Sequence, residues 1–462
     1  MRTSVFPMVA VAVFTLSGCT VGPEYVRPDP KAPLAWNAAK ATDDDRVRQV
    51  QSADRGQERS WWAAFNDPML DQFIDTAVTR NLDLRIARAR VLEARASRGV
   101  SAAQLYPEIN LVGTGERGNR RLVTQNRTVG LYDAGFDAAW EIDLFGGTRS
   151  RVQAADALVE ASVDEERNTL LTLRAEVARN YLELRDAQTR LQVTRENTTS
   201  RRDVASLTAT LRRAGLRSEL DVSQARSQFL ALEPQIPVLV TAIDRSTRRI
   251  EVLLGEAPGA LSATLAMPRP VPVPGEAVWL ADPVSVLARR PDVGIAERRL
   301  ASATALNAAA VAELYPKVSL AGLVGYRDAT GAPSFGIWSI AGAIAAPIFN
   351  AGRIRSQIDA ADARRQEALA SFEQTVLLAL EEVEVNLVSY LNAEETRKGL
   401  VVLVENEEDK LALADDRYRR GLTGFIDVLE AQRSLQESQI SLARAQGDVG
   451  RTFVALNKSL GR

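Results

Sequence analysis

Apolar residues recur at the three- and four-residue spacing of α-helices over two very long stretches of the chain. Residues 147–213 and 353–420 contain no proline, and Gly399 is the only glycine that follows the first residue of either stretch. We predict that each stretch forms one helix about 100 Å long, at about 1.5 Å per residue, and helices of this length need a coiled-coil partner. In the second stretch the apolar positions approach the repeat of a coiled-coil seam: Leu369, Phe372, Val376, Leu380, Val383, Leu387 and Tyr390.

A shorter helical segment follows each long one. The segments at 218–254 and 424–460 are about half as long as the helices before them, and Pro234 and Pro237 are expected to kink the first of them. Each pair of helices therefore forms a hairpin.

The two hairpins, at 146–255 and 352–461, are related by a constant shift of 206 positions without a gap. Helices tolerate substitutions, but inserted residues destroy the register of their facing sides. An ungapped match of this length indicates a tandem duplication. Eight identical residues mark it: Gly146, Asp156, Asn180, Gly215, Asp221, Val222, Ala225 and Gly255 correspond to Gly352, Asp362, Asn386, Gly421, Asp427, Val428, Ala431 and Gly461.

The duplication extends upstream of the hairpins. Asp67-Pro68 and Asp282-Pro283 are each typical of a helix start, with aspartate as the N-cap and proline at the first helical position. The helical pattern of each copy ends at a Leu-Tyr-Pro sequence, and prolines separate the copies. We predict a first repeat at 61–255, a proline-rich linker at 256–281 and a second repeat at 282–462.

After each Leu-Tyr-Pro the pattern changes to the alternation of a β-strand. From Tyr132 to Leu144 the even positions are apolar, while odd positions include Asp133, Asp137, Glu141 and Asp143. This strand exceeds the length of about 9–11 residues that crosses a bilayer as a tilted strand. The four predicted strands lie at about 108–116, 130–144, 317–327 and 334–349.

Four strands are too few to close a membrane barrel, because single-chain barrels start at about eight. An open sheet in lipid would leave the hydrogen-bonding groups of its edges unsatisfied, at a cost of several kcal/mol each. A barrel built from these strands must therefore be shared between chains, and arithmetic permits a dimer, a trimer or a larger ring. The alternative is an antiparallel sheet on a soluble core.

The N-terminus carries the most specific short signal in the chain. An apolar run from Val5 to Leu16 follows Arg2, and Ser17-Gly18 precede Cys19. The run is too short to span a bilayer, and the small residues are typical of signal-peptide processing, which predicts a signal peptide at 1–18. The alternative is an ordinary signal peptide with an incidental cysteine.

This segment resembles a bacterial lipoprotein box. The resemblance implies that Cys19 becomes the first residue of the mature protein and carries a covalent lipid, a diacylglycerol group with an N-acyl chain such as palmitate. By the same resemblance, Thr20 favours sorting to the outer membrane. Residues 19–60 are rich in proline and charge, and we expect an extended arm without a core of its own.

Composition narrows the possible chemistry. The formal net charge of −2 gives no indication of a nucleic-acid partner. The chain contains no histidine and a single cysteine, so zinc, copper, haem or Ser-His-Asp chemistry has almost no ligands or bases. We expect no enzymatic activity, no metal and no cofactor besides the lipid.

Three stretches carry a family resemblance. They are Cys19–Tyr25, Arg289–Glu297 continuing to Leu314-Tyr315-Pro316, and Tyr418–Thr423 with Asp427-Val428-Leu429. With the duplicated hairpins and the four strands, they are similar to the TolC-like outer-membrane factors, in the NodT/OprM-like lipoprotein branch. The resemblance implies a mainly α fold with a coiled-coil tunnel of tandem-duplicated hairpins, and four transmembrane strands per chain in a shared 12-stranded trimeric β-barrel.

The resemblance also implies a function. Members of this family form the outer-membrane exit duct of tripartite efflux pumps in Gram-negative bacteria and passively conduct small molecules. The implied partners are two further copies of the chain, a periplasmic adaptor (membrane fusion protein), an inner-membrane RND-type transporter and outer-membrane lipid. The alternatives are a duct for type I polypeptide secretion and a lipid-anchored periplasmic coiled-coil scaffold without a pore.

By resemblance, the far ends of the hairpins contain a periplasmic gate. Tyr418 and Asp427 match gate positions, Asp221 matches their partner in the first hairpin, and Glu430 lies where the family can carry a further acid. We expect a link between Tyr418 and Asp221. Thr423 replaces the gate arginine of the TolC-type pattern, so the full salt-bridge latch is not expected. Crowded carboxylates at this constriction would favour cations.

The two turns are the predicted docking sites for the adaptor. Glycine suits the left-handed position that ends a helix, which by itself explains both turn glycines. The resemblance adds that Gly215, Leu216, Gly421, Leu422 and Thr423 contact the adaptor. At the other end, the acidic face of the predicted strand at 130–144 is expected to line the lumen and to favour cations.

Overall fold

The computed structural model describes residues 20–37, 47–50, 60–122, 125–275, 278–330 and 332–462. The predicted signal peptide and Cys19 lie outside the described residues. The chain divides into two compact units, and each draws segments from both repeats. The sheet unit comprises Met1–Pro28, Arg90–Ser162 and Ile295–Phe372; the hairpin unit comprises Asp29–Ala89, Val163–Gly294 and Glu373–Arg462.

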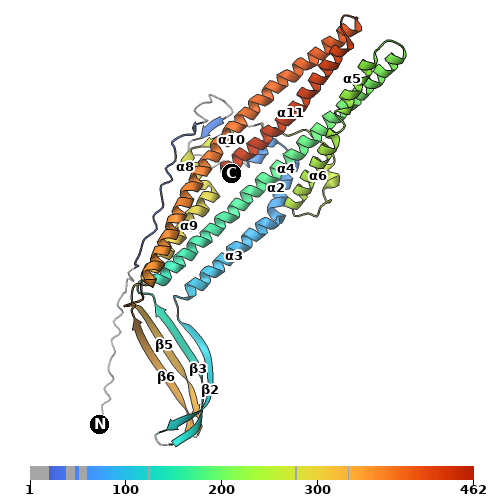
Figure 1. The fold of residues 1–462 in the computed structure, drawn as a ribbon. Coiled ribbons are helices and arrows are strands. Elements are labelled where there is room, and N and C mark those ends of the chain that lie inside the picture. Colours follow the sequence, from blue (N-terminus) through green and yellow to red (C-terminus); the bar gives the residue numbers. More distant parts are fainter. Residues whose placement is uncertain (1–19, 38–46, 51–59, 123–124, 276–277, 331) are drawn as a thin grey trace. The chain divides into compact units, whose positions relative to one another are not determined.

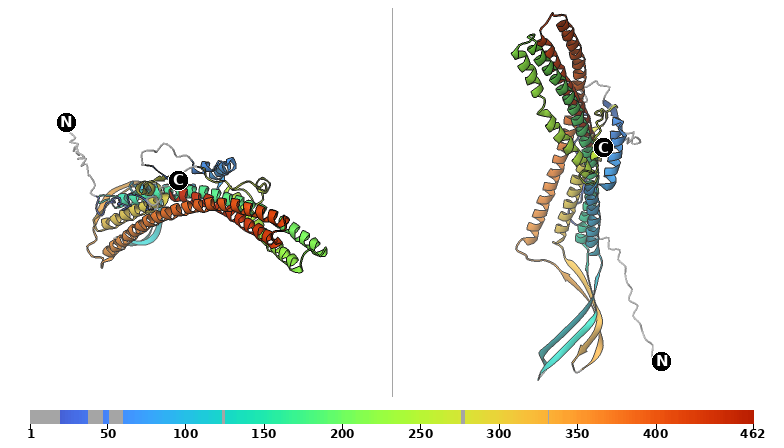
Figure 2. Two further views of the ribbon diagram at one scale, coloured as in Figure 1. Left: turned by 90° about the horizontal axis from the view of Figure 1, so that it is seen from above. Right: turned by 90° about the vertical axis from the view of Figure 1, so that its right-hand side faces the viewer.

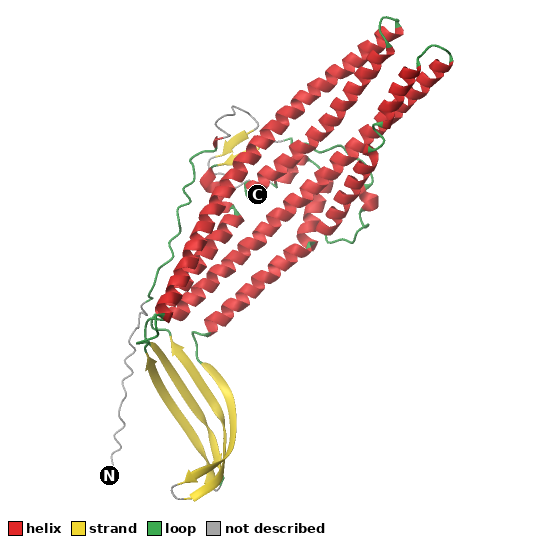
Figure 3. Ribbon diagram, in the orientation of Figure 1, coloured by secondary structure: helices red, strands yellow, loops and turns green. Residues whose placement is uncertain are grey.

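Helices dominate the chain, and the strands are few (Figure 3). No helix among the described residues combines the length and the apolar character needed to cross a bilayer. In chain order the elements are β1 (Val47–Val50), η1 (Trp61–Phe65), α2 (Pro68–Arg80), α3 (Leu82–Ala103), β2 (Glu108–Leu122), β3 (Gln125–Ile142), α4 (Gly147–Arg213), α5 (Glu219–Leu230), α6 (Gln235–Leu253), α7 (Ser262–Leu265), β4 (Val278–Ala281), α8 (Pro283–Arg289), α9 (Pro291–Ala312), β5 (Lys317–Ala329), β6 (Ala332–Ala345), α10 (Arg353–Arg419) and α11 (Phe425–Ser459).

The sheet unit contains one antiparallel sheet with the strand order β2-β3-β5-β6 (Figure 1). β3 belongs to the first repeat and β5 to the second, so the two repeats meet at the centre of the sheet. β2 and β6 form its two edges. The four predicted strands are confirmed, and β2 is longer than predicted because it extends to Leu122.

The register gives this sheet one polar and one apolar face. Asp133, Asp137 and Glu141 of β3 lie on one face, because side chains alternate along a strand. The opposite face carries large apolar residues with at least half of their surface exposed: Leu111, Tyr132, Phe136, Val324, Tyr326, Trp338, Ile340 and Ile344. The apolar face therefore extends across all four strands, whereas the polar side chains of the opposite face belong mainly to β2, β3 and β5, because β6 places Phe335 and Ile337 there.

Two predicted strand ends are wrong. β3 ends at Ile142, so Asp143 is not part of the strand's acidic face. Its carboxylate instead accepts hydrogen bonds from the backbone N–H of Arg149 at 2.8 Å and from Arg149 Nε at 3.2 Å. The first amides of a helix have no partner within the helix, which explains why α4 captures this acid. β6 ends at Ala345, two residues before Pro347, which has no N–H for a strand ladder.

In the hairpin unit, long and short helices share one hydrophobic core. Tyr181 and Leu182 of α4 are fully buried, as is Leu456 of α11. Phe453 of α11 packs edge-on against Phe65, with ring centres 5.4 Å apart. Of the predicted coiled-coil residues of α10, Val383, Leu387 and Tyr390 belong to the same core, and Leu380 packs against it.

The predicted helix starts at both Asp-Pro sequences are confirmed. Asp67 accepts hydrogen bonds from the N–H groups of Met69 and Leu70, at 2.9 Å and 3.4 Å. Asp282 accepts one from the N–H of Ser285 at 2.9 Å. Each repeat therefore begins with the same N-cap.

The return helices end against these first helices. The Asn81 side chain, between α2 and α3, donates to the carbonyl of Leu253 at 2.9 Å. The corresponding Arg290, between α8 and α9, donates to the carbonyl of Ser459 at 2.6 Å. The two repeats thus use the same junction, as the duplication predicts.

The return helix of the first hairpin is broken, whereas that of the second is continuous. α5 ends at Leu230 and α6 begins at Gln235, so the predicted kink is a full interruption that ends at Pro234. α11 runs unbroken from Phe425 to Ser459. The missing N–H of proline accounts for the difference.

The arm and the linker contain structure that the sequence did not predict. Val47–Val50 pairs in parallel with Val278–Ala281, as a two-stranded sheet of β1 and β4. Trp36 is buried in the core of the hairpin unit and donates from Nε1 to the carbonyl of Ala281 at 2.7 Å. The linker also contains the short helix α7. Both segments are therefore partly integrated into the core.

Candidate functional site

Both hairpin turns have the same compact geometry. Gly215 and Gly421 adopt left-handed backbone angles, with φ of +75° and +73°. The N–H groups of Gly215 and Leu216 donate back to carbonyls of the preceding helical turn at 2.9 Å, and those of Gly421 and Leu422 do the same. This is the hydrogen-bond pattern of a Schellman closure. It leaves Leu216 69% and Leu422 64% exposed at the two tips.

One side chain joins the two tips, which lie side by side in Figure 2. Arg217, directly after the first turn, donates a hydrogen bond to the hydroxyl of Tyr418 at the end of α10. Its guanidinium carbon lies 5.2 Å from the ring centre of Tyr418 and 4.9 Å from that of Phe425. A guanidinium is attracted to aromatic faces at such distances. We call Arg217, Tyr418 and Phe425 the Arg217 clamp.

Asp221 does not take part in the clamp, so the expected Tyr418–Asp221 link is wrong. The Asp221 carboxylate accepts a hydrogen bond from the N–H of Ser218 at 2.9 Å, and the Ser218 hydroxyl accepts one from the N–H of Asp221 at 3.1 Å. This reciprocal capping box starts α5. The hydrogen bonds from Ser218 hold the pKa of Asp221 below its ordinary value.

Asp427 occupies the matching position in the second hairpin but has a different environment. Gly424 replaces the capping serine, and α11 has no side-chain cap. Among the described residues, neither the Asp427 nor the Glu430 carboxylate forms a hydrogen bond or an ion pair. Both line an open groove of about 710 Å³ on the second hairpin, together with Lys410, Leu413, Arg417 and Thr423.

Thr423 is one of the residues that line this groove. Its hydroxyl oxygen is buried without a hydrogen-bond partner among the described residues. The two equivalent carboxylates therefore differ: Asp221 is held by its own helix start, while Asp427 faces a groove of mixed charge.

The polar face of the sheet contains more cations than the sequence pattern indicated. Asp133 forms a two-pronged ion pair with Arg327 of β5, at 2.7 Å and 2.8 Å. Glu141 lies 3.9 Å from Lys317 Nζ. One carboxylate oxygen of Asp137 is buried without a partner among the described residues. The acidic face is therefore largely neutralised at both ends and open in the middle.

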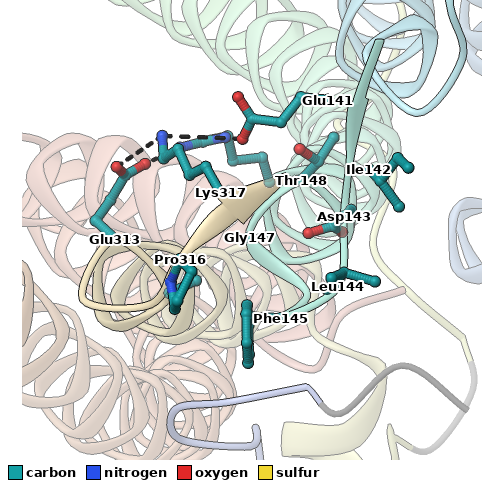
Figure 4. Close-up of a pocket in the computed structure, with 12 residues that line it drawn as sticks. Glu141, Ile142, Asp143, Leu144, Phe145, Gly147, Thr148, Glu313, Pro316 and Lys317 are labelled. Carbon is teal, nitrogen blue, oxygen red and sulfur yellow. Dashed lines mark hydrogen bonds and ion pairs between the residues drawn. The ribbon is translucent and has the colours of Figure 1, made fainter. Parts of the chain in front are cut away.

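A charged cluster occupies the junction between strands and helices in the sheet unit (Figure 4). Glu313 accepts from Arg151 at 2.7 Å and lies 2.9 Å from Lys317 Nζ. Burial alone would raise the pKa of Glu313, but these two cations hold it below the ordinary value. The small cavity here, about 30 Å³, also contacts Asp143 and Phe145. The cluster joins β3, α4, α9 and β5.

The start of the N-terminal arm is fixed to the sheet unit. Tyr25 donates to Glu297 at 3.1 Å, and Arg27 forms an ion pair with the same carboxylate at 2.9 Å. Burial and the neighbouring Glu297 raise the pKa of Tyr25 to about 12. The N–H of Val21 donates to the carbonyl of Phe145 at 3.3 Å. The residues next to Cys19 therefore lie at the junction that follows β3.

Arg217, Arg327 and Lys317 are the functional candidates that sequence reasoning missed. Arg217 sits next to a predicted turn, but its partner lies 201 positions away. The two strand cations face acids only once the register of β3 and β5 is known. By contrast, Ser218-x-x-Asp221 is a capping-box pattern that was readable in the sequence. Among the described residues, no group of three or more acids or cysteines is arranged to hold a metal ion.

A protein-family model and several known proteins match nearly the whole chain. A family model described as outer membrane efflux protein matches residues 73–256 and 283–462. The chain is 30% identical to nodulation protein T of Rhizobium leguminosarum bv. trifolii, over 96% of this chain and 95% of that protein. It is 32% identical to the pyoverdine export outer membrane protein OpmQ of Pseudomonas putida, over 87% and 88%.

A solved structure is also similar over nearly the whole chain. The outer-membrane channel OprN superposes with a TM-score of 0.89 at 35% sequence identity. The match covers 96% of this chain and 99% of that one. The similarity thus includes both the sheet and the duplicated hairpins.

Proposed function

The chain belongs to the outer membrane efflux protein family and is an outer-membrane efflux channel of a Gram-negative bacterium, and on this premise we propose how its own residues form, gate and anchor the duct. Channels of this family are trimeric and work with the other parts of a tripartite pump. The proposed duct passively conducts small molecules delivered by an inner-membrane RND-type transporter through a periplasmic adaptor. The observation that supports it best is the sheet, with one apolar face, one polar face and two open edges.

In this proposal the polar face of the sheet lines the water-filled lumen. One carboxylate oxygen of Asp137 has no partner among the described residues, while Arg327 and Lys317 balance Asp133 and Glu141. The apolar face contacts lipid, with Tyr132 and Trp338 as interfacial anchors. The lumen therefore prefers cations only weakly at the sheet, and most of the preference arises at the periplasmic end.

The periplasmic end is closed by the Arg217 clamp. Arg217 supplies from the first hairpin the cation that Thr423 does not supply from the second, and it ties that hairpin to Tyr418. Asp427 and Glu430 face the mouth as unpaired acids and attract cations. Asp221 stabilises the start of α5 and contributes its charge to the same region.

The adaptor docks on the two tips. Leu216 and Leu422 are exposed apolar side chains on rigid turns, which suits contact with an apolar helical hairpin. Leu216→Asp with Leu422→Asp should abolish adaptor crosslinking in cells. Leu220→Asp is the matched control, because Leu220 is 65% exposed but lies on α5 outside the turn.

Cys19 anchors the mature protein through its lipid. The arm beyond it is held by Glu297 and by the junction after β3, and this fixed path supports an anchor close to the barrel. No catalytic step belongs to this proposal.

The proposed function is tested by dye efflux from intact cells. Deletion of the gene should slow the efflux of an ethidium-type dye, and the wild-type chain should restore it. The Leu216→Asp/Leu422→Asp variant should reach the outer membrane as a trimer but should not restore efflux. Unchanged efflux in the deletion strain, with no other channel expressed, would contradict the proposal.

A further inference from the structure

The two edges of the sheet need a partner. Among the described residues, β2 and β6 are paired on one side only, and no strand there lies next to their outward N–H and C=O groups. In lipid each unsatisfied backbone group costs several kcal/mol. A second copy of the chain is the partner that the family supplies, so this inference rests on the proposed function. The register between the edge strands of neighbouring copies can be derived from the internal duplication.

The internal duplication fixes equivalent strand positions. Glu108 pairs with Ala139 at the start of the first strand pair, and Lys317 pairs with Ala345 at the start of the second. Residues of β2 therefore correspond to residues of β5 that lie 209 positions later, and residues of β3 to residues of β6 that lie 206 positions later. The second shift equals that of the following hairpins.

The helices of the sheet unit support the same correspondence. Arg98 of α3 pairs with Asp156 of α4 at 2.8 Å. The equivalent residues of the second repeat, Asn307 of α9 and Asp362 of α10, form a hydrogen bond at 3.1 Å. Shifts of 209 and 206 positions therefore convert side-chain contacts of the first repeat, as well as its strand pairs, into those of the second.

The central strand pair provides the template for the junction between copies. β3 and β5 join the first repeat to the second, with Ala139 opposite Ala321 and Asp137 opposite Leu323. In a closed ring, the second repeat of one copy meets the first repeat of the next. We propose that β6 of one copy pairs in antiparallel fashion with β2 of the next, with Ala345 opposite Val112 and Ala343 opposite Thr114.

The faces of the strands agree with this register. Val112 and Ala345 both lie on the polar face, because Val112 pairs with Gly135 and Ala345 with Lys317. The next pair, Gly113 opposite Ile344, lies on the apolar face. A slip by one residue would place polar-face residues of one copy against lipid-face residues of the next, so only slips by two residues compete.

The helices of the sheet unit are neighbours in the same order as the strands that they adjoin in sequence. In the sheet unit, ion pairs and hydrogen bonds join α3 to α4, α4 to α9 and α9 to α10. α3 and α10 are therefore the outer helices, just as β2 and β6 are the outer strands. Both layers present their first-repeat edge to the second-repeat edge of a neighbour.

Exposure of apolar residues on α3 identifies the surface that the neighbour covers. Leu92 is 64% exposed, whereas Ala301 at the equivalent position of α9 is 8% exposed. Val100 is 69% exposed, whereas the equivalent Ala309 is 4% exposed. α4 covers one side of α9, where Arg298 of α9 forms an ion pair with Glu160 of α4 at 3.0 Å. The exposed positions of α3 therefore mark the side that α10 of the next copy covers.

Paired cysteine substitutions test the register. Directly opposite residues have Cβ atoms about 4.5–5.5 Å apart, whereas diagonal neighbours are about 7–8 Å apart. A disulfide needs a Cβ separation of about 3.5–4.5 Å, which an opposite pair can reach by a small shift. Val112→Cys/Ala345→Cys and Thr114→Cys/Ala343→Cys are the in-register pairs. Val112→Cys/Ala343→Cys and Thr114→Cys/Ala345→Cys use the same four positions, but each is displaced by two residues.

Each variant is oxidised as the assembled protein in native membranes and analysed without reductant. The in-register pairs should form covalent dimers and trimers several-fold faster than the displaced pairs. Faster crosslinking of either displaced pair would overturn the register, as would no crosslinking of any pair in assembled trimers. Conductance of the reduced variants is measured in parallel, so that a failed register is distinguished from a failed channel.

Discussion

The Arg217 clamp predicts how tightly the periplasmic end is closed. Replacing Arg217 by Gln keeps a polar side chain but removes the guanidinium, whose charge faces two aromatic rings and whose N–H donates to the Tyr418 hydroxyl. We expect the variant to open more often than wild type. The first and second hairpins of each chain would then separate at lower cost.

The magnitude follows from the contacts. A cation over an aromatic ring contributes about 0.5–1 kcal/mol at exposed sites, so the rings of Tyr418 and Phe425 contribute about 1–2 kcal/mol per chain. Since about 1.4 kcal/mol corresponds to a factor of ten, the closed-to-open ratio should fall about 5- to 30-fold for each chain. The hydrogen bond to Tyr418 adds to this loss.

Open probability in planar bilayers measures the effect. Arg212→Gln is the matched control: Arg212 lies in the same turn region but forms its ion pair with Glu219 of its own hairpin, at 2.6 Å. It should leave the open probability unchanged. The double variant Arg217→Gln/Tyr418→Phe should resemble Arg217→Gln alone, because the two substitutions remove the same hydrogen bond. Equal open probabilities for Arg217→Gln and wild type would refute the clamp.

Three further predictions concern the lumen, the helix start and the anchor. Arg327→Gln should free the carboxylate of Asp133 and increase cation selectivity, measured as a larger reversal potential under a salt gradient. The pKa of Asp221 is lower in the folded state than the unfolded value of about 3.9, so its contribution to stability is complete above that value and disappears as the pH falls through the folded pKa. Hydrogen-exchange protection of the amides at 218–222 should therefore drop only as the pH falls below about 3.9, and Asp221→Asn should remove this dependence; an identical drop in the variant would refute the assignment. Cys19→Ser should abolish fatty-acid labelling, and continued labelling would disprove the lipid anchor.

The sequence predicted features that depend on local pattern. Long proline-free segments predicted α4 and α10, and the alternation around Asp137 predicted β3. The matching turns at Gly215 and Gly421 predicted the left-handed closures, because few other residues adopt that backbone conformation at low cost. These features depend on residues that lie a few positions apart in the sequence, or on the period of one helix or strand.

The remaining features depend on contacts between distant segments. The partner of Tyr418 is Arg217 and not Asp221, because Asp221 satisfies the first amides of its own helix. The partial neutralisation of the acidic strand depends on the register between repeats, which no local pattern contains. The strands β1 and β4 are each four residues long, too short to give a detectable alternation.

Single-channel conductance of the purified mature trimer in a planar bilayer tests the central claim most directly. The wild-type protein should give discrete, small, cation-preferring current steps. Asp427→Asn with Glu430→Gln should lower the cation preference, because both carboxylates lack a partner among the described residues at the proposed mouth. An absence of current steps from protein that is shown to be trimeric and inserted in the membrane would contradict the account.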